Sequence, residues 1–459
     1  MDTVSTFLAM FSSFQSALTL PTYENLCVLV RGAILSSGPR TVTECIRCAW
    51  PWVTKHHSAY GNVLRRADIR GAKLMRILIQ MILSLVPEGT VINLMVDETL
   101  VRRYGLYVSG VSMHRDPILS SQSRNEMRPG NKWVVLAIAV KLPFLENYVA
   151  LPIMSALYIS PKRAKHRRPG CEGKRHRTPS GLARLMVARF SKIVPRRKFR
   201  LIGDAAYATH EIADLLNPNS RWCPNGSMVS RFQMTARLHE EPGEYSGLGR
   251  PRIIGKRLPN PHQMASREDA DWVRTPLQWY GGKLKEFMLL TGEGLWYRCS
   301  QGATWVRWVI VRKPEGKCKD EIFFTTDRNM SPVEIVECFV RRWSIEVTFE
   351  EARRHLGIET LRNRTANAIH RSVPMLLALY SLIIVWYSNN RDKIALCSNS
   401  APWYRKTSPT FSDMLKAAKQ DILNDPFIKQ AALKSAEFLV PPFPLNIIYS
   451  LIKYKHKAA

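Results

Sequence analysis

The sequence predicts a mixed α/β fold in which a helical N-terminal region precedes a sheet interrupted by a β-rich insertion. Up to about residue 85, apolar residues such as Leu26, Val30 and Ile34 recur at helical spacing. From about residue 90 they instead form short runs of strand length, and residues 331–357 then carry the signals of a capped helix. We therefore divide the chain into a helical N-terminal domain (1–88), a first core part (89–232), a β-rich insertion (233–320), a second core part (321–390) and a basic C-terminal tail (391–459).

The charge of the chain indicates its partner. A formal net charge of +30 and an isoelectric point near 10.0 point to a polyanion, most simply nucleic acid, in preference to a membrane surface. Nine cysteines without a disulfide pattern fit a reducing compartment, and the first 20 residues lack the basic start of a signal peptide. The longest apolar run, Val373 to Tyr387, is shorter than the roughly 20 residues needed to span a bilayer. We expect it to be a buried helix, with no helix long enough to cross a membrane.

The N-terminal helices carry many basic residues. We expect these to contact DNA, the alternative being a solvated basic face. Cys45 and Cys48, followed by His56 and His57, have the residue types of a zinc site, but their spacing matches no known finger, and residues 43–50 read as a helix. The basic residues of the N-terminal helices that we expect to contact DNA are Arg40, Lys55, Arg65, Arg66, Arg70, Lys73 and Arg76.

Two predicted strands end in aspartate. The run 91–96 is followed by Asp97, and the run 199–203 by Asp204. A carboxylate at the end of a buried strand is costly unless it is paired or binds a metal. Asp116 lies in a loop before a proline, so we prefer Asp97 as the first carboxylate. Strands at 91–96, 132–140 and 148–153, a helix at 179–193 and a strand at 199–203 follow the order of a ribonuclease-H-like sheet.

The predicted insertion contains proline- and glycine-rich loops followed by short strands at 285–290, 295–299 and 305–311. Its tryptophans could stack an extruded base, although a place in the core of a small β-domain is the more common role. They are Trp272, Trp279, Trp296, Trp305 and Trp308. A separate loop at 161–177 carries eight Lys or Arg residues; it is either a solvated linker or a segment that contacts phosphates.

The segment 331–357 reads as one helix. Ser331 caps it, Pro332 fits its first turn, and Gly357 can end it. Phe339, Trp343 and Val347 recur at helical spacing, which predicts that they share a buried face. Arg342, Glu346 and Arg353 fall near one face, which suits either surface ion pairs or a carboxylate held beside phosphates. With Asp97 and Asp204, Glu346 completes a set of three carboxylates suited to Mg²⁺ or Mn²⁺.

The ordered set Asp97, Asp204 and Glu346 resembles bacterial insertion-sequence transposases of the DDE type, over roughly residues 40–390. The resembled branch carries its glutamate in a Tyr-Arg-Glu-Lys signature and has a β-rich insertion before it. Arg342 and Glu346 match that signature, whereas Phe339 stands in place of the tyrosine and Arg353 in place of the lysine. The resemblance also covers Val96-Asp97-Glu98-Thr99, Gly203-Asp204-Ala205-Ala206-Tyr207, and Trp343-Ser344-Ile345-Glu346 with Phe349.

The resemblance implies a transposase that hydrolyses DNA at the ends of an element and joins the freed 3′-hydroxyl to target DNA. Asp97, Asp204 and Glu346 would be catalytic and would hold the metal, with two Mg²⁺ or Mn²⁺ ions. It further implies a homodimer on paired DNA ends in the bacterial cytoplasm at the nucleoid, without membrane association. A metal-dependent nuclease of the same fold and a non-catalytic DNA-binding relic remain alternatives, and Glu350 or Glu351 could replace Glu346. The expected DNA contacts are Arg342, Arg353, Arg102, Arg354, Lys162 and Arg163.

Overall fold

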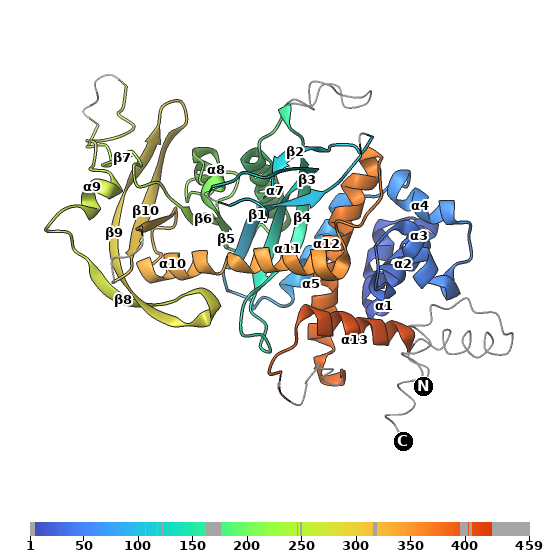
Figure 1. Cartoon of the computed structure of the whole chain (residues 1–459). Helices are drawn as coiled ribbons and strands as arrows, with labels where there is room; N and C mark the ends of the chain where they lie inside the picture. Colours follow the sequence, from blue (N-terminus) through green and yellow to red (C-terminus); the bar gives the residue numbers. More distant parts are fainter. Residues whose placement is uncertain are drawn as a thin grey trace. The chain divides into compact units, whose positions relative to one another are not determined.

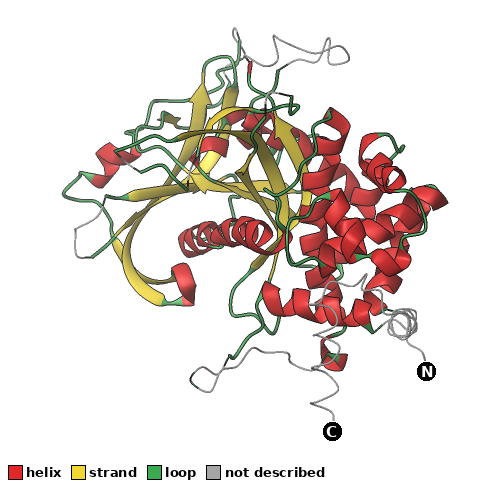
Figure 2. Ribbon diagram, turned by 45° about the vertical axis from the view of Figure 1, so that its right-hand side comes forward, coloured by secondary structure: helices red, strands yellow, loops and turns green. Residues whose placement is uncertain are grey.

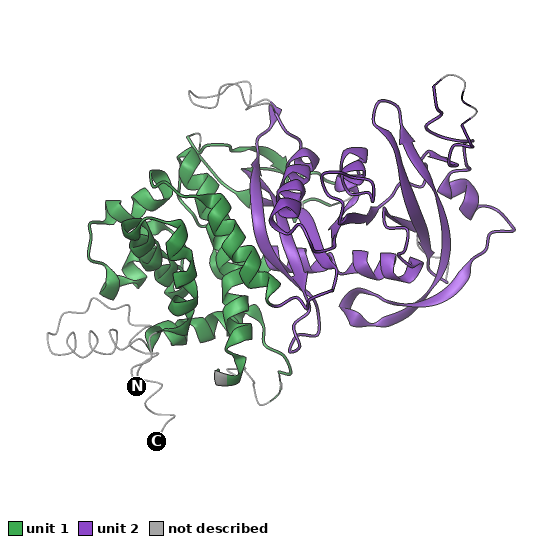
Figure 3. Cartoon of the chain, turned by 180° about the vertical axis from the view of Figure 1, so that it is seen from behind, with its two compact units in different colours: residues 1–84, 101–130, 350–459 green, residues 85–100, 131–349 purple. Residues whose placement is uncertain are grey.

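The computed structural model divides the chain into two compact units (Figure 3). Unit 1 comprises residues 1–84, 101–130 and 350–459, and unit 2 comprises residues 85–100 and 131–349. The structure describes residues 5–424 except 106, 117, 122, 162–175, 246, 248–249, 315–318, 395–402 and 404–405.

Unit 2 is built on a mixed sheet, which confirms the predicted α/β class (Figure 1). Its strands follow the order β3-β1-β5-β6-β11-β10-β9-β7, with β4 paired to β3 and β8 paired to β9. β1, β5 and β6 run parallel, whereas β6, β11, β10 and β9 pair antiparallel. The strands are β1 (Ile92–Arg102), β3 (Met127–Val140), β4 (Val149–Tyr158), β5 (Phe199–Gly203), β6 (Gly226–Arg231), β7 (Leu238–His239), β8 (Val273–Gln278), β9 (Leu284–Arg298), β10 (Gly302–Arg312) and β11 (Glu321–Thr325).

Helices cover both faces of this sheet (Figure 2). The ring of Phe199 on β5 packs against Phe190 of α7 (Pro179–Ile193) at 5.4 Å. The next residue, Arg200, pairs with Glu334 of α10 (Pro332–Val340) at 3.0 Å. Because successive strand residues point to opposite faces, α7 and α10 lie on opposite sides of β5. The short helices α8 (His210–Leu215) and α9 (Pro261–Ala265) and the 3₁₀ turns η3 (Ala205–Tyr207) and η4 (Tyr280–Gly282) complete the unit.

The sequence predicted most of these elements, with two corrections in the strands. The helix at 179–193 and the strand at 199–203 are confirmed. The first strand does not end before Asp97: β1 continues to Arg102, because Leu100 and Val101 are also buried. The predicted pieces 285–290 and 295–299 are one long strand, β9, and the strands of the insertion extend the main sheet.

The glutamate segment is two helices and not the single helix predicted. α10 ends at Val340, and α11 runs from Trp343 to Leu356. At the junction, the backbone N–H groups of Arg342 and Ile345 bond three residues back, to Phe339 and Arg342, instead of four. Such a 3₁₀ turn tightens the backbone and reorients the helix that follows. Ser331 caps α10 as predicted, since its hydroxyl accepts from the N–H of Glu334.

The buried face of α11 also differs from the prediction. Trp343 is 53% exposed and Val347 is 42% exposed, whereas Ile345 and Phe349 are buried. The turn at Arg342 shifts the helical phase, so the apolar positions of α10 do not continue in line through α11. The predicted shared face therefore stops at Phe339.

Unit 1 is mainly helical. Gly32 of α2 lies so close to the backbone of Cys45 on α3 that a Cβ at Gly32 would meet the Cys45 carbonyl oxygen at 1.9 Å, so only glycine fits there. The predicted helix at 43–50 is confirmed as α3. The helical elements of unit 1, besides the last turns of α11, are α1 (Thr6–Phe11), η1 (Ser12–Ala17), α2 (Leu20–Leu35), α3 (Val42–Cys48), η2 (Trp50–Trp52), α4 (His57–Arg65), α5 (Gly71–Leu83), α12 (Ala366–Asn389), η5 (Arg391–Lys393) and α13 (Phe411–Leu423).

The apolar run at 373–387 lies inside α12, a helix of 24 residues. By length and composition alone α12 could cross a membrane, so the prediction that no helix is long enough is wrong. However, 72% of its most apolar stretch is buried within the structure. Val373, Leu377 and Tyr387 are among the buried side chains, as expected of a core helix.

A short strand, β2 (Ser112–Arg115), pairs antiparallel with the first residues of β3 in unit 1. After it comes Asp116, which is 1% exposed and accepts hydrogen bonds from the Arg102 side chain at 2.6 Å and from the N–H groups of Ile118 and Leu119. Burial alone would raise the pKa of Asp116, but these bonds outweigh it and lower the pKa. Asp116 therefore holds its own loop together, in agreement with our preference for Asp97.

Candidate active site

The sheet places the two aspartates next to each other. β1 and β5 are parallel, and their last paired positions are Val96 and Gly203. Asp97 and Asp204 are the next residue on each strand, so they lie side by side where the pairing ends. Buried parallel strands read as continuous apolar runs, and the carboxyl ends of such strands are the usual place for a site.

The helix pair α10–α11 brings Glu346 to these aspartates through Arg342. One guanidinium nitrogen, Nη1, donates to Asp97 Oδ2 at 2.6 Å, and Nη2 donates to Glu346 Oε1 at 2.8 Å. Glu350 and Glu351, the alternatives to Glu346, instead pair with residues four positions later on their own helix. Glu346 is therefore the glutamate that shares a partner with Asp97.

Alternate residues of β1 face this helix pair. Asn93 accepts from the Cys338 thiol, Met95 accepts from the Ser344 hydroxyl at 3.1 Å, and Asp97 accepts from Arg342. Because side chains on a strand alternate, positions 93, 95 and 97 share one face. The period of two along β1 thus directs Asp97 toward the junction between α10 and α11.

Asp97 is the most perturbed acid of the site. Burial raises its pKa to about 7, the Arg342 guanidinium lowers it, and the charges of Asp204 and Glu346 raise it again. The pKa of Tyr207 lies well above its usual value because of burial and the nearby charges of Glu98, Asp97 and Asp204. The pKa of Asp97 thus responds to the charges of both Asp204 and Glu346, which places the three carboxylates near one another. Perturbed acids of this kind gather at functional sites.

The three carboxylates suit a hard divalent cation. Carboxylate oxygens are the ligands that Mg²⁺ and Mn²⁺ prefer, and the negative charges of Asp204 and Glu346 both reach Asp97. Within the described part of the chain, no three His, Cys, Asp or Glu side chains are gathered closely enough to hold an ion as they stand. Arg342 lies between two of the three carboxylates. The donor set therefore fits the ion in kind, and the oxygen atoms of Asp97 and Glu346 are held by a guanidinium.

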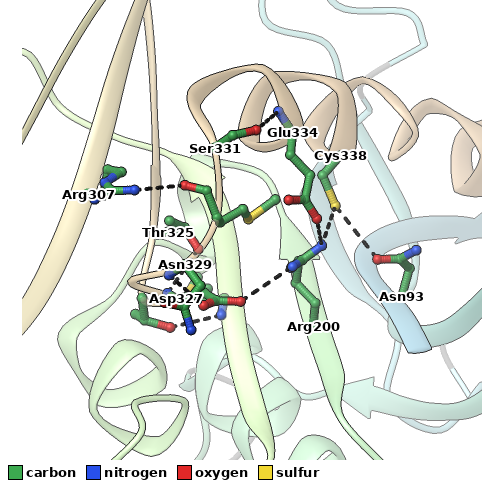
Figure 4. Close-up of polar contacts among 12 residues, drawn as sticks. Asn93, Arg200, Arg307, Thr325, Asp327, Asn329, Ser331, Glu334 and Cys338 are labelled. Carbon is green, nitrogen blue, oxygen red and sulfur yellow. Dashed lines mark hydrogen bonds and ion pairs between the residues drawn. The ribbon is translucent and has the colours of Figure 1, made fainter. Parts of the chain in front are cut away.

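A second polar cluster fixes the elements behind the site (Figure 4). Arg200 of β5, which is 5% exposed, donates to Glu334 at 3.0 Å and to Asp327 at 3.4 Å. It also contacts the sulfur of Cys338 at 3.9 Å, and that thiol bonds to Asn93 at 3.7 Å. The cluster therefore joins β1, β5 and α10, the three elements that lead to Asp97, Asp204 and Glu346.

The start of α11 is also tied to unit 2. Thr348, fully buried, donates its hydroxyl to the carbonyl of Ala150 on β4 at 2.7 Å. Neither Thr348 nor the cluster around Arg200 was predicted to support the site. Only Arg200, a charged residue inside an otherwise apolar run, gave a signal in the sequence.

Aromatic side chains border the carboxylates. The exposed rings of Tyr280 and Trp343 lie 6.0 Å apart, and the pKa of Tyr280 is raised chiefly by burial, while Arg342 lowers it and Glu346 raises it. Glu346 and Arg342 are thus within electrostatic reach of Tyr280. An adjacent pocket of about 460 Å³ is lined by Arg231, Phe232, Met234, Trp279, Phe287, Val311, Lys313, Lys319, Asp320, Glu321 and Ile322.

The tryptophans of the insertion take up different positions. Trp308 is buried, as in a core. Trp296 stacks on His210 at 3.7 Å, and Trp279 packs against Phe287 at 4.5 Å beside the pocket. Trp272 lies under the Arg312 guanidinium at 4.0 Å.

Three of the predicted DNA-contacting arginines are engaged in ion pairs in unit 1. Arg102 pairs with Asp116 at 2.6 Å and with Glu359 at 3.7 Å, and Arg353 pairs with Glu359 at 3.8 Å. Arg354 pairs with Glu350 at 2.5 Å and is 62% exposed. Lys162 and Arg163, together with most of the loop at 161–177, lie outside the described residues.

A ribonuclease-H-like sheet with adjacent aspartates where the pairing of two parallel strands ends is the arrangement of a nuclease-type enzyme. The family model described as DDE superfamily endonuclease matches residues 14–284, more than half of the chain. The chain belongs to this family, which confirms the resemblance to the DDE type. The match spans Asp97 and Asp204 and ends before Glu346, so Glu346 stays a prediction from the sequence, and its link to Asp97 comes from their shared partner Arg342. No curated protein matches the chain significantly.

Proposed function

We propose that the protein is a DNA transposase of a bacterial insertion sequence that cuts DNA at the ends of its element and joins the freed 3′-hydroxyl to target DNA. The observation that carries the proposal is the grouping of Asp97, Asp204 and Glu346 where the pairing of β1 and β5 ends, with Arg342 between Asp97 and Glu346. The branch with a Tyr-Arg-Glu-Lys-like signature is part of the proposal. It rests on Arg342 and Glu346, with Phe339 and Arg353 at the two substituted positions.

The three carboxylates would hold Mg²⁺ or Mn²⁺, as two ions. When bound, such ions supply Lewis-acid stabilisation of the phosphate and activation of the attacking water or hydroxyl. The chain itself contributes positioning. Asp97 and Asp204 are fixed by strand pairing, and Glu346 is fixed by the start of α11. Arg342 supplies a planar guanidinium that can bind phosphate oxygens with two parallel bonds.

Double-stranded DNA is the substrate that fits the charge. A surplus of 30 positive charges attracts phosphates along a long stretch of duplex. The exposed rings of Tyr280 and Trp343 offer a surface on which an unpaired base next to the cut can stack. Arg353, Arg102, Arg354, Lys162 and Arg163 stay predicted as further phosphate contacts. Assembly on paired ends as a homodimer, and a place at the nucleoid in the cytoplasm, complete the proposal.

Cleavage of DNA that carries the element's own ends tests the chemistry. The wild-type protein should cut at the end only with Mg²⁺ or Mn²⁺, and Glu346→Gln should abolish cutting while DNA binding persists. Glu350→Gln is the matched control, because its carboxylate lies one turn later on α11 and pairs with Arg354 at 2.5 Å. Full activity of Glu346→Gln would contradict the assignment.

A second substrate separates the transposase from a nuclease of the same fold. With an end that is already cut, a transposase joins the 3′-hydroxyl to target DNA, and a nuclease produces no joined product. Binding to ends without cutting or joining under either metal would instead identify a non-catalytic relic.

A further inference from the structure

The guanidinium of Arg342 lies between the carboxylates of Asp97 and Glu346. Its side chain is 13% exposed, and those of Asp97 and Glu346 are 14% and 35% exposed. At 2.6 and 2.8 Å both contacts are charge-assisted hydrogen bonds of full strength. The guanidinium thus supplies much of the counter-charge that these two acids meet within the protein.

Arg342 is not locked into this place by further bonds. Its Nε is buried and has no hydrogen-bond partner among the described residues. The guanidinium also lies 5.5 Å from the centroid of the Phe339 ring. The arginine also sits in the tight turn between α10 and α11, so its side chain can reorient without disturbing a regular helix.

A divalent ion at this site would draw on the same oxygen atoms. Two like charges within a few ångströms repel strongly where the protein excludes water. A guanidinium bonded to Asp97 and Glu346 therefore opposes the entry of a metal ion, and an ion bound to these oxygens weakens the hold on the guanidinium.

We propose that Arg342 is a resident cation that holds Asp97 and Glu346 together in the metal-free protein and is displaced when a divalent ion binds. This inference rests on the proposed function, because it takes the carboxylates as the metal ligands. Displacement frees the guanidinium and its unused Nε donor for a phosphate of the DNA. Metal and DNA phosphate then favour each other's binding, since each removes a competitor of the other.

Mn²⁺ binding to the full chain without DNA tests the inference, with isothermal calorimetry and electron paramagnetic resonance of free Mn²⁺ as readouts. Arg342→Gln should bind Mn²⁺ about tenfold more tightly than wild type, the effect of removing one nearby positive charge. Arg342→Lys, which keeps the charge, should stay close to wild type. Arg341→Gln is the matched control, because Arg341 pairs with Glu337 at 3.8 Å and, among the described residues, forms no ion pair with Asp97 or Glu346. Equal or weaker Mn²⁺ binding by Arg342→Gln would overturn the inference.

Two further measurements separate the possible failures. Glu346→Gln should weaken Mn²⁺ binding; if it does not, the proposed metal site itself is wrong. If Glu346→Gln weakens binding and Arg342→Gln weakens it too, only the resident-cation inference fails. Thermal unfolding checks the fold of each variant. Arg342→Gln should melt below wild type without metal, and saturating Mn²⁺ should raise its melting temperature by more than that of wild type. A smaller rise than that of wild type would also overturn the inference.

Discussion

Arg200 is paired with two carboxylates, and replacing these carboxylates should lower the free energy of unfolding more than replacing Arg200 itself. The side chain of Arg200 is 6% exposed, whereas those of Asp327 and Glu334 are 30% and 45% exposed. In Asp327→Asn with Glu334→Gln the guanidinium stays buried with no opposite charge beside it. Such uncompensated burial costs about 3–5 kcal/mol of the free energy of unfolding.

Arg200→Met leaves a different situation. The methionine side chain keeps most of the buried volume, and the two carboxylates can rehydrate because both already reach solvent. The expected cost is the loss of charge-assisted bonds, about 1–2 kcal/mol. A surface pair with the same chemistry provides the control. Arg231 and Glu321 are 46% and 38% exposed, so Glu321→Gln should cost less than about 1 kcal/mol.

Urea unfolding, followed by far-ultraviolet circular dichroism and by tryptophan fluorescence, measures these differences. The double variant should lose the most stability, Arg200→Met less, and Glu321→Gln least. If Arg200→Met proved the least stable of the three, burial of the unpaired charge would not be the main determinant of stability here, and the reasoning would be refuted.

Three more predictions concern the site and its surroundings. Thr348→Val should destabilise the protein by about 1–2 kcal/mol in urea, because it leaves the buried Ala150 carbonyl without its donor, whereas Thr348→Ser should restore most of this. Burial lowers the pKa of His210 to about 4, and a nearby arginine lowers it further by a smaller amount. The folded protein therefore binds a proton at His210 less readily than the unfolded chain does. Its free energy of unfolding should fall by up to about 3 kcal/mol as the pH falls from 6.5 to 4. His210→Phe keeps the stacking on Trp296 and should remove most of the change in stability between pH 6.5 and pH 4. If the pH dependence of the variant equals that of wild type, another group causes it. Burial raises the pKa of Asp97 to about 7, so below that pH Mn²⁺ must compete with a proton for this carboxylate. The Mn²⁺ affinity measured by calorimetry should therefore rise by up to about tenfold per pH unit and level off above pH 7.

The sequence was sufficient where a local pattern determines the structure. The apolar runs before Asp97 and Asp204 are typical of parallel strands covered on both faces, and β1 and β5 have that environment. The carboxylates stood out because a charge directly after such a run needs a partner. The residues matched by the family model include both aspartates.

The division of the glutamate segment into α10 and α11 could not be predicted from the sequence, because it depends on the turn at Arg342. Arginine is a good helix former, and apolar residues continue on both sides of it, so nothing local predicts the end of α10. The turn places the Arg342 guanidinium on Asp97 of β1, a residue distant in the sequence. The same long-range contact decides between Glu346 and Glu350, which are alike in their local sequence. Contacts between residues so far apart in the chain have no signature in a single sequence.

Two arginines of unit 2, the buried Arg200 and the partly buried Arg342, have different electrostatic roles. Asn93 and Asp97 are four residues apart on one face of β1, and Arg200 and Asp204 are four residues apart along β5. Four residues of strand span about 13 Å, so this is the distance between the cluster around Arg200 and the carboxylates around Arg342. Arg200 is bound by Glu334 and Asp327, which lie outside the proposed metal site, and its pairing with Glu334 joins α10 to β5. Arg342 is bound by Asp97 and Glu346, the proposed metal ligands, so the resident-cation proposal requires that its place be exchangeable. A site with three converging carboxylates is unfavourable without a cation, and a protein that met this cost with a permanent ion pair would exclude its metal. In the resident-cation proposal, Arg342 in its tight turn provides the counter-charge and leaves the carboxylates open to exchange.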